Sequence, residues 1–157
     1  MKPLELIRII AITVFGIILV LLVQPWLYRS EIISLDVFDV EQWIVTDYTP
    51  SSYWVLAAAI AATVIWYFSA ANAKPLTAKD TSSWRLLWWL FLLIPIASIG
   101  IALYQQTEPS SRVALAGLYV LDVLVLYWLP TASSSPAHTK YLPPLSMPIR
   151  RLVEPGS

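Results

Sequence analysis

One carboxylate, Asp122, stands inside an apolar stretch near residues 113–129, and it is the residue in this sequence best placed to do chemistry. An ionisable side chain is costly at the centre of a membrane span, so such residues usually face the bundle interior or a cavity. Burial favours the neutral acid, which can donate a hydrogen bond to a neighbouring helix. We expect Thr13 and Thr63 at similar depth and Tyr119 one turn away on the same face. Asp122 therefore either fastens helices together or carries protons or ions.

Two further features concern the shape and packing of helices. Pro95 interrupts the third apolar stretch and leaves the Phe91 carbonyl without its usual donor, which predicts a kink. Transporters use similar breaks to coordinate ions. Ala58 and Ala62 have the small-xxx-small spacing that lets two helix backbones approach closely. This spacing predicts a packing face on the second helix, for a partner in the same chain or in another.

The residues that most other active sites need are missing from the sequence. There is no cysteine, which excludes disulfides, thiolate metal sites and a nucleophilic thiol. The only histidine, His138, lies outside the apolar stretches, so no imidazole is available inside the membrane for haem or copper. Paired carboxylates, a zinc motif, a phosphate loop and dinucleotide-binding glycines do not occur. We therefore expect no enzyme activity, no cofactor and no metal.

The elements that position these residues are four long apolar stretches. The chain is 58% hydrophobic and only 13% charged, far more apolar than a soluble domain. Charged side chains almost completely avoid residues 6–28, 53–73, 84–104 and 113–129. Each stretch is long enough to cross a hydrocarbon core about 30 Å thick as a helix, and none alternates as a barrel strand does. The sequence predicts an all-α integral membrane protein with a four-helix transmembrane domain over residues 1–130.

The basic residues predict the orientation in the membrane. If the chain crosses four times, most of them fall on the side that carries both termini: Lys2, Arg8, Lys74, Lys79, Arg85, Lys140, Arg150 and Arg151. The positive-inside rule makes that side cytoplasmic. The opposite side has Arg29, Arg112 and an acidic set: Glu31, Asp36, Asp39, Glu41, Asp47 and Glu108. We expect a multi-pass protein of a bacterial plasma membrane or a thylakoid-type membrane, with both termini cytoplasmic.

The outer loop, residues 29–52, is long enough to hold structure of its own. Asp39 followed by Gln42 resembles a capping box, which predicts a short helix in the outer interface. Pro50 would end this helix. The residues around Leu35 and Val37 fit a strand as well, so both readings stay open.

The tail, residues 131–157, is rich in proline and serine, which predicts an extended or disordered cytoplasmic segment. Its candidate contact residues are Tyr141, Pro143, Pro144, Arg150 and Arg151. They fit a polyproline-type docking segment, two arginines lying against anionic lipid, or an unstructured end.

These observations predict a small polytopic membrane protein that acts as an assembly, scaffold or accessory subunit. Its partners would be the lipid bilayer and other membrane proteins, or a second copy of itself, and the balanced net charge does not suggest nucleic acid. One alternative is a small transporter or transport-complex subunit that uses Asp122 and the Pro95 kink. A second alternative is a membrane enzyme that acts on lipid.

Overall fold

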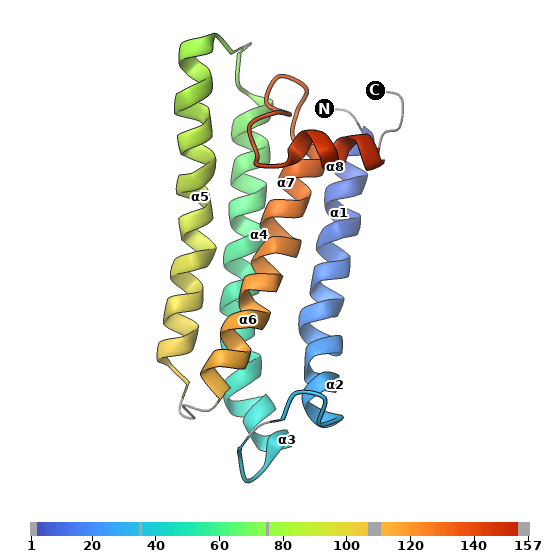
Figure 1. The fold of residues 1–157 in the computed structure, drawn as a ribbon, viewed down its shortest axis with the longest axis vertical. Coiled ribbons are helices and arrows are strands. Elements are labelled where there is room, and N and C mark those ends of the chain that lie inside the picture. Colours follow the sequence, from blue (N-terminus) through green and yellow to red (C-terminus); the bar gives the residue numbers. More distant parts are fainter. Residues whose placement is uncertain (1–2, 35, 75, 107–110, 154–157) are drawn as a thin grey trace.

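The computed structural model describes residues 3–34, 36–74, 76–106 and 111–153, and within them the regular structure is helical throughout (Figure 1). Lys2, Leu35 and Glu108 lie outside the described residues. The elements are α1 (Pro3–Ile18), η1 (Leu19–Val23), α2 (Gln24–Arg29), α3 (Val40–Trp43), η2 (Ile44–Tyr48), α4 (Thr49–Ala71), α5 (Ala78–Tyr104), α6 (Ser111–Val123), η3 (Leu124–Trp128), α7 (Leu129–Ser134) and α8 (Ser146–Val153), where η marks a π-helical turn.

Four continuous helical segments are long and apolar enough to cross a membrane. We call them span 1 (Pro3–Arg29), span 2 (Val40–Ala71), span 3 (Asp80–Tyr104) and span 4 (Ser111–Ser134). The all-α prediction and the four apolar helices are thus confirmed. Span 2 begins well before the stretch predicted from residue 53. The predicted orientation in the membrane is a separate matter and stays a prediction.

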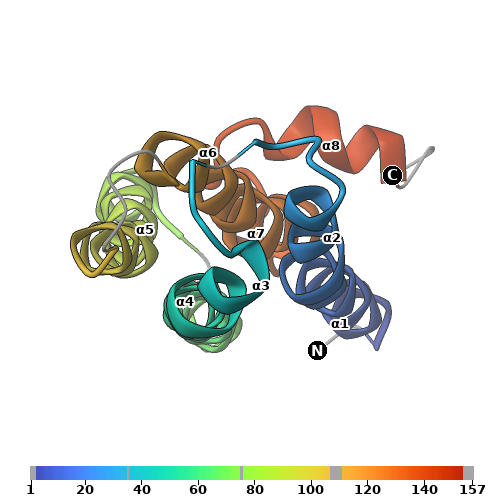
Figure 2. The same cartoon turned by 90° about the horizontal axis from the view of Figure 1, so that it is seen from below.

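Spans 2 and 4 form the centre of the bundle, with span 1 on one side and span 3 on the other (Figure 2). α1 contacts α7 and η3, whereas α5 contacts α4 and α6. Only 17% of the most apolar part of spans 1 and 3 is buried, against 39% in spans 2 and 4. The rest of the chain therefore leaves most of the surface of the outer two helices uncovered.

The outer loop contains α3, but this helix is the beginning of span 2, and the predicted interfacial helix is not supported. The Asp39 side chain accepts a hydrogen bond from the Gln42 backbone N–H at 3.0 Å and caps α3. The chain then passes through η2 into α4 without leaving helical backbone angles, so Pro50 does not end the helix. Val37 lies in a coil, and the described residues contain no strand.

Three of the four spans carry a π turn directly before a proline. A single residue separates η1 from Pro25. The same spacing separates η2 from Pro50 and η3 from Pro130. Inside a regular α-helix, a proline ring clashes with the carbonyl four residues earlier and removes one N–H donor. A π turn adds a residue to that turn, which moves the carbonyl away from the ring. This geometry explains why the helices continue through these prolines.

Proline has no N–H group to donate to the carbonyls of the preceding turn. Side chains from a neighbouring span donate hydrogen bonds to carbonyls there instead. The Val20 carbonyl, five residues before the first of them, accepts a hydrogen bond from Tyr48 Oη at 2.7 Å. The Leu126 carbonyl, four residues before the last of them, accepts one from Thr63 Oγ1 at 2.6 Å. An unpaired carbonyl in hydrocarbon is costly, so each bond both satisfies the backbone and joins two spans.

The tail differs from the extended or disordered segment that the sequence predicts. α7 extends span 4 beyond Trp128, and α8 lies across the end of the bundle from which α1 begins (Figure 1). Leu142, Thr139 and Ser146 are almost fully buried. The prolines of this segment prevent one continuous helix. They do not prevent packing against the bundle, because the turns between the prolines direct apolar side chains toward the bundle.

Two arginines hold the tail in place by binding the last carbonyls of span 4. Arg150 in α8 donates to the Ala132 carbonyl at 3.2 Å and to the Ser135 carbonyl. Arg8 in α1 donates to the Ser133 carbonyl at 2.7 Å. The last carbonyls of a helix have no partner within it and carry partial negative charge, so cations stabilise this end.

The predicted orientation can be tested with single cysteines, because the native chain has none. Ser82 and Lys140 are exposed near the end that carries α8, and Ser34 is exposed near the end that carries α3. In intact cells, an impermeant maleimide should label Ser34→Cys and should label Ser82→Cys and Lys140→Cys only after permeabilisation. Ser134→Cys, in a buried position, serves as the control that reacts only after unfolding. Labelling of Lys140→Cys in intact cells would contradict the predicted orientation and indicate the opposite one.

The role of the Thr63 hydroxyl can be tested by Thr63→Val, which keeps the shape of the side chain but leaves the Leu126 carbonyl without its donor. We expect thermal unfolding in detergent to show a loss of about 0.5–2 kcal/mol in stability, the scale of interhelical hydrogen bonds in membranes. Thr13→Val is the matched control, because Thr13 is half-buried and its hydroxyl has no partner among the described residues. Equal stability of the two variants would contradict this role.

Candidate functional site

Asp122 lies in a buried polar cluster that joins spans 1, 2 and 4. Gln24 Nε2 in α2 donates to Asp122 Oδ1 in α6 at 2.5 Å. The other end of the same amide, Gln24 Oε1, accepts from Tyr48 Oη in η2 at 2.7 Å. Gln24 thus binds one side chain from each of the other two spans, and the amide orientation follows from these two partners.

A second set of hydrogen bonds runs beside the first, one helical turn along span 4. Tyr119 Oη and Ser51 Oγ lie 2.6 Å apart, and Gln106 Nε2 donates to Ser51 Oγ at 3.1 Å. Arg112 donates to the Gln106 carbonyl at 3.0 Å. Since Gln106 follows the end of α5, this set leads from the α3 end of the bundle inward to Tyr119, on the same face of α6 as Asp122.

The cluster is closed to solvent. None of its side chains is more than 3% exposed; they are Gln24, Tyr28, Tyr48, Ser51, Gln106, Tyr119 and Asp122. Three of its atoms, Asp122 Oδ2, Tyr28 Oη and Gln106 Oε1, have no hydrogen-bond partner among the described residues. The arrangement can hold helices together. It does not form an open passage.

The structure brings only some of the predicted polar residues together. Tyr119 is fully buried on the face of Asp122, but Thr63 binds the Leu126 carbonyl and Thr13 is half-buried in α1. The partner of Asp122 is Gln24, which the sequence analysis did not select. The relative height of two helices is set by their packing and is not visible in the chain. Gln24 is a strongly polar residue within an apolar stretch, and this feature of the sequence could have indicated a buried polar contact.

The packing face of α4 is also turned relative to the prediction. Ala62 is fully buried, whereas Ala58 is only partly buried and its neighbour Ala59 is fully buried. Ala59 packs with Val20 from span 1 and Leu126 from span 4. Gly16 in α1 contributes to the same close approach, because a Cβ there would lie 2.3 Å from Leu126 Cδ2. Small residues thus bring three helices together at this level.

Pro95 is buried within α5, which continues through it to Tyr104 without a π turn. The Ser98 hydroxyl donates to the Pro95 carbonyl at 2.8 Å, within the same helix. Among the described residues, no further polar side chain forms a hydrogen bond at this position that could help to coordinate an ion. The kink that the sequence predicts here stays a prediction.

The tail residues proposed for docking divide into two groups. Arg150 and Pro143 are buried, and Arg150 binds the end of span 4, so neither is free to meet a partner. Tyr141 and Arg151 are exposed, and Pro144 is partly exposed. The Pro144 carbonyl accepts a hydrogen bond from Trp128 Nε1 at 2.9 Å, which fixes this segment to span 4.

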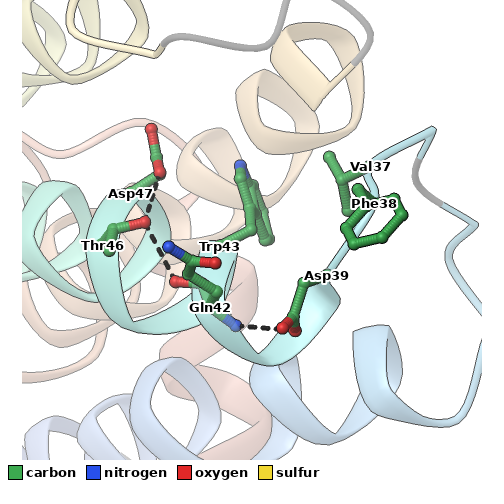
Figure 3. A pocket seen from close by; sticks show the side chains of 7 residues that line it. All are labelled: Val37, Phe38, Asp39, Gln42, Trp43, Thr46 and Asp47. Carbon is green, nitrogen blue, oxygen red and sulfur yellow. Dashed lines mark hydrogen bonds between the residues drawn. The ribbon is translucent and has the colours of Figure 1, made fainter.

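A hollow of about 210 Å³ opens at the α3 end of the bundle (Figure 3). Its lining residues are Val37, Phe38, Asp39, Gln42, Trp43, Thr46 and Asp47. Thr46 Oγ1 donates to Asp47 Oδ2 at 2.6 Å and to the Gln42 carbonyl at 2.9 Å. The Phe38 ring is fully exposed. The hollow thus combines carboxylates with an uncovered aromatic ring.

No protein-family model, curated protein or solved structure matches this chain. In the part of the chain that the structure describes, no group of three or more histidine, aspartate or glutamate side chains could hold a metal ion. A proposal about function therefore has to rest on the contacts and surfaces described above.

The role of Asp122 can be separated into structure and proton transfer by two substitutions. Asp122→Asn keeps an acceptor for Gln24 Nε2 but cannot release a proton, whereas Asp122→Leu leaves that amide unpaired. If the residue fastens helices, Asp122→Asn should be nearly silent and Asp122→Leu should lose about 0.5–2 kcal/mol of stability in detergent. Complementation is measured beside stability. A stable but inactive Asp122→Asn protein would instead support proton or cation transport.

Proposed function

We propose that this protein is an accessory or assembly subunit that binds another membrane protein through the Phe38 surface, the exposed part of the hollow formed by Val37, Phe38, Asp39 and Gln42. The single observation that supports it most strongly is the fully exposed Phe38 ring directly before Asp39, the residue that caps α3. Exposed aromatic rings in fixed positions are typical anchors of protein interfaces.

Several contacts hold the segment that carries Phe38. Directly after it, Asp39 caps α3, and Trp43 in α3 packs edge-on against Tyr28 with ring centroids 5.0 Å apart. Also in α3, both carboxylate oxygens of Glu41 accept from Arg29 at the end of α2, at 2.7 and 3.1 Å. This exposed ion pair adds little to stability, but its paired geometry fixes α3 against the end of α2. Phe38 is thus presented with little ordering left to do on binding.

The charge around Phe38 indicates the chemistry of the partner. Arg29 is paired with Glu41, while Glu31, Asp36 and Asp39 add further negative charge to the same loop. Complementary charge speeds association and fixes the register of an interface. We therefore propose a partner segment in which lysine or arginine lies next to an apolar patch that receives the Phe38 ring.

The remaining polar groups support this assignment by being occupied elsewhere. The cluster around Asp122 is closed and joins three spans, which is what a fastening role requires. The described tail is packed on the bundle, and Arg150 is bound to span 4. We further propose that both termini are cytoplasmic, in a bacterial plasma membrane or a thylakoid-type membrane, so that the Phe38 surface faces outward.

A small transporter, or a transport-complex subunit, is the second candidate. It is supported by the hydrogen bonds from Gln106 through Ser51 to Tyr119, which lead inward toward Asp122, and by the unpartnered oxygen of that carboxyl group. Chains of polar groups of this kind can relay protons. The comparison of Asp122→Asn with Asp122→Leu separates this candidate from the first.

The first candidate is tested by a photo-crosslinking amino acid placed at position 38 in the native membrane. It should give one discrete adduct, and Phe38→Ala should lower the affinity of the purified complex by about 10- to 100-fold, the range of interface anchors. Phe68→Ala is the matched control, because that ring is also exposed but lies near the opposite end of span 2.

The charge of the partner is tested in the same assay. Asp36→Asn should weaken the complex, and added salt should weaken the wild-type complex more than this variant. An adduct of twice the chain mass would identify a second copy as the partner. A smear of products, or an affinity that Phe38→Ala leaves unchanged, would contradict docking through this surface.

A further inference from the structure

A second hollow, of about 430 Å³, lies at the opposite end of the bundle, between the beginning of α5 and the tail segment 141–148 that leads into α8. We call it the α8-end hollow. Arg85 and Trp89, one turn apart on α5, form one wall, and residues from Tyr141 to Pro148 form the other. Figure 1 shows α5 beginning at the same end of the bundle as α8.

The wall formed by the tail is held rigidly. Leu142 and Ser146 are almost fully buried, and Trp128 binds the Pro144 carbonyl at 2.9 Å. Between these fixed points, Leu145 has a φ of 59°, a left-handed conformation that is rare for a leucine. Strained backbone of this kind persists where the surroundings impose it, and it is common at ligand sites. The conformation leaves the Leu145 side chain 66% exposed.

The charge of the α8-end hollow is positive. Among the described residues, Arg85 is the one charged residue that lines it, and no described residue is a hydrogen-bond or ion-pair partner of its guanidinium. No carboxylate is present among the described lining residues to neutralise it. A guanidinium group with free donors matches the oxygens of a phosphate group, which it can bind through two parallel hydrogen bonds.

The position of the hollow along span 3 indicates which kind of molecule carries that phosphate. Arg85 and Trp89 lie in the first turns of span 3, at the level where an apolar helix enters the membrane. Tryptophan and tyrosine rings favour this interface, and both Trp89 and Tyr141 are exposed. Leu145 and Met147 add exposed apolar side chains on the opposite wall. A ligand here meets a cation and an apolar surface together, as a phospholipid does.

We propose that the α8-end hollow binds one anionic phospholipid, with the phosphate on Arg85, the headgroup between Trp89 and Tyr141, and an acyl chain along Leu145 and Met147. The described part of the lining offers no carboxylate to pair with the ammonium group of a choline or ethanolamine headgroup. The site therefore selects lipids with net negative charge, such as phosphatidylglycerol. It is separate from the Phe38 surface and does not depend on the function proposed for that surface.

The test is native mass spectrometry of the full chain, released from mixed micelles that contain equal amounts of phosphatidylglycerol and phosphatidylcholine. The wild-type protein should retain one phosphatidylglycerol molecule preferentially, and Arg85→Gln should reduce this retention by about tenfold or more, as expected for a lost hydrogen-bonded charge pair. Arg151→Gln is the matched control, because Arg151 is an exposed arginine of α8 that does not line the hollow. It should retain the lipid.

A second variant keeps the test decisive if Arg85→Gln is unstable. Leu145→Asp adds a carboxylate to the hollow at a backbone conformation that aspartate adopts more readily than leucine, so the fold should persist while phosphatidylglycerol is lost. Inorganic phosphate in excess should not displace the lipid, since it lacks the acyl chains. Equal retention of the two lipids by the wild type, equal losses in Arg85→Gln and Arg151→Gln, or displacement by phosphate would each overturn the proposal.

Discussion

A backbone carbonyl or N–H group inside hydrocarbon has no water to bind, so the protein itself must provide every partner. This chain makes that requirement harder to meet, because each span contains a proline: Pro25, Pro50, Pro95 and Pro130. Three of them follow a π turn, which makes room for the ring. Two of the carbonyls near them bind Tyr48 and Thr63 from span 2. The prolines thus determine where neighbouring helices must be joined.

The buried polar cluster follows from the same requirement. Tyr48 donates to a carbonyl of span 1 and also lies against Gln24, which in turn binds Asp122. The site of a proline-related carbonyl is therefore also the site where three spans share hydrogen bonds. One turn along span 4 toward the end that carries α8, Gly16 and Ala59 allow the helix backbones to approach. A closed cluster beside tight packing explains why we assign Asp122 a fastening role before a transport role.

Because the interior is occupied in this way, we propose recognition only at the two ends of the bundle. One end presents the Phe38 ring among carboxylates, and the other presents Arg85 among aromatic and apolar side chains. The two surfaces have opposite charge and sit on segments fixed by short-range contacts, Asp39 at the cap of α3 and Pro144 against span 4. In our two proposals, the partner protein and the lipid meet different chemistry at opposite ends of the same molecule.

The sequence by itself determined the four apolar helices and the Asp39 cap, because the length of an apolar stretch and a local capping bond depend only on neighbouring residues. It also singled out Asp122 as buried. The partner of Asp122 was decided only by the tertiary structure, since the height and rotation of each helix come from packing; Gln24 takes the place expected for Thr13. The same holds for the tail, where Arg150 binds carbonyls that only the folded bundle brings within reach.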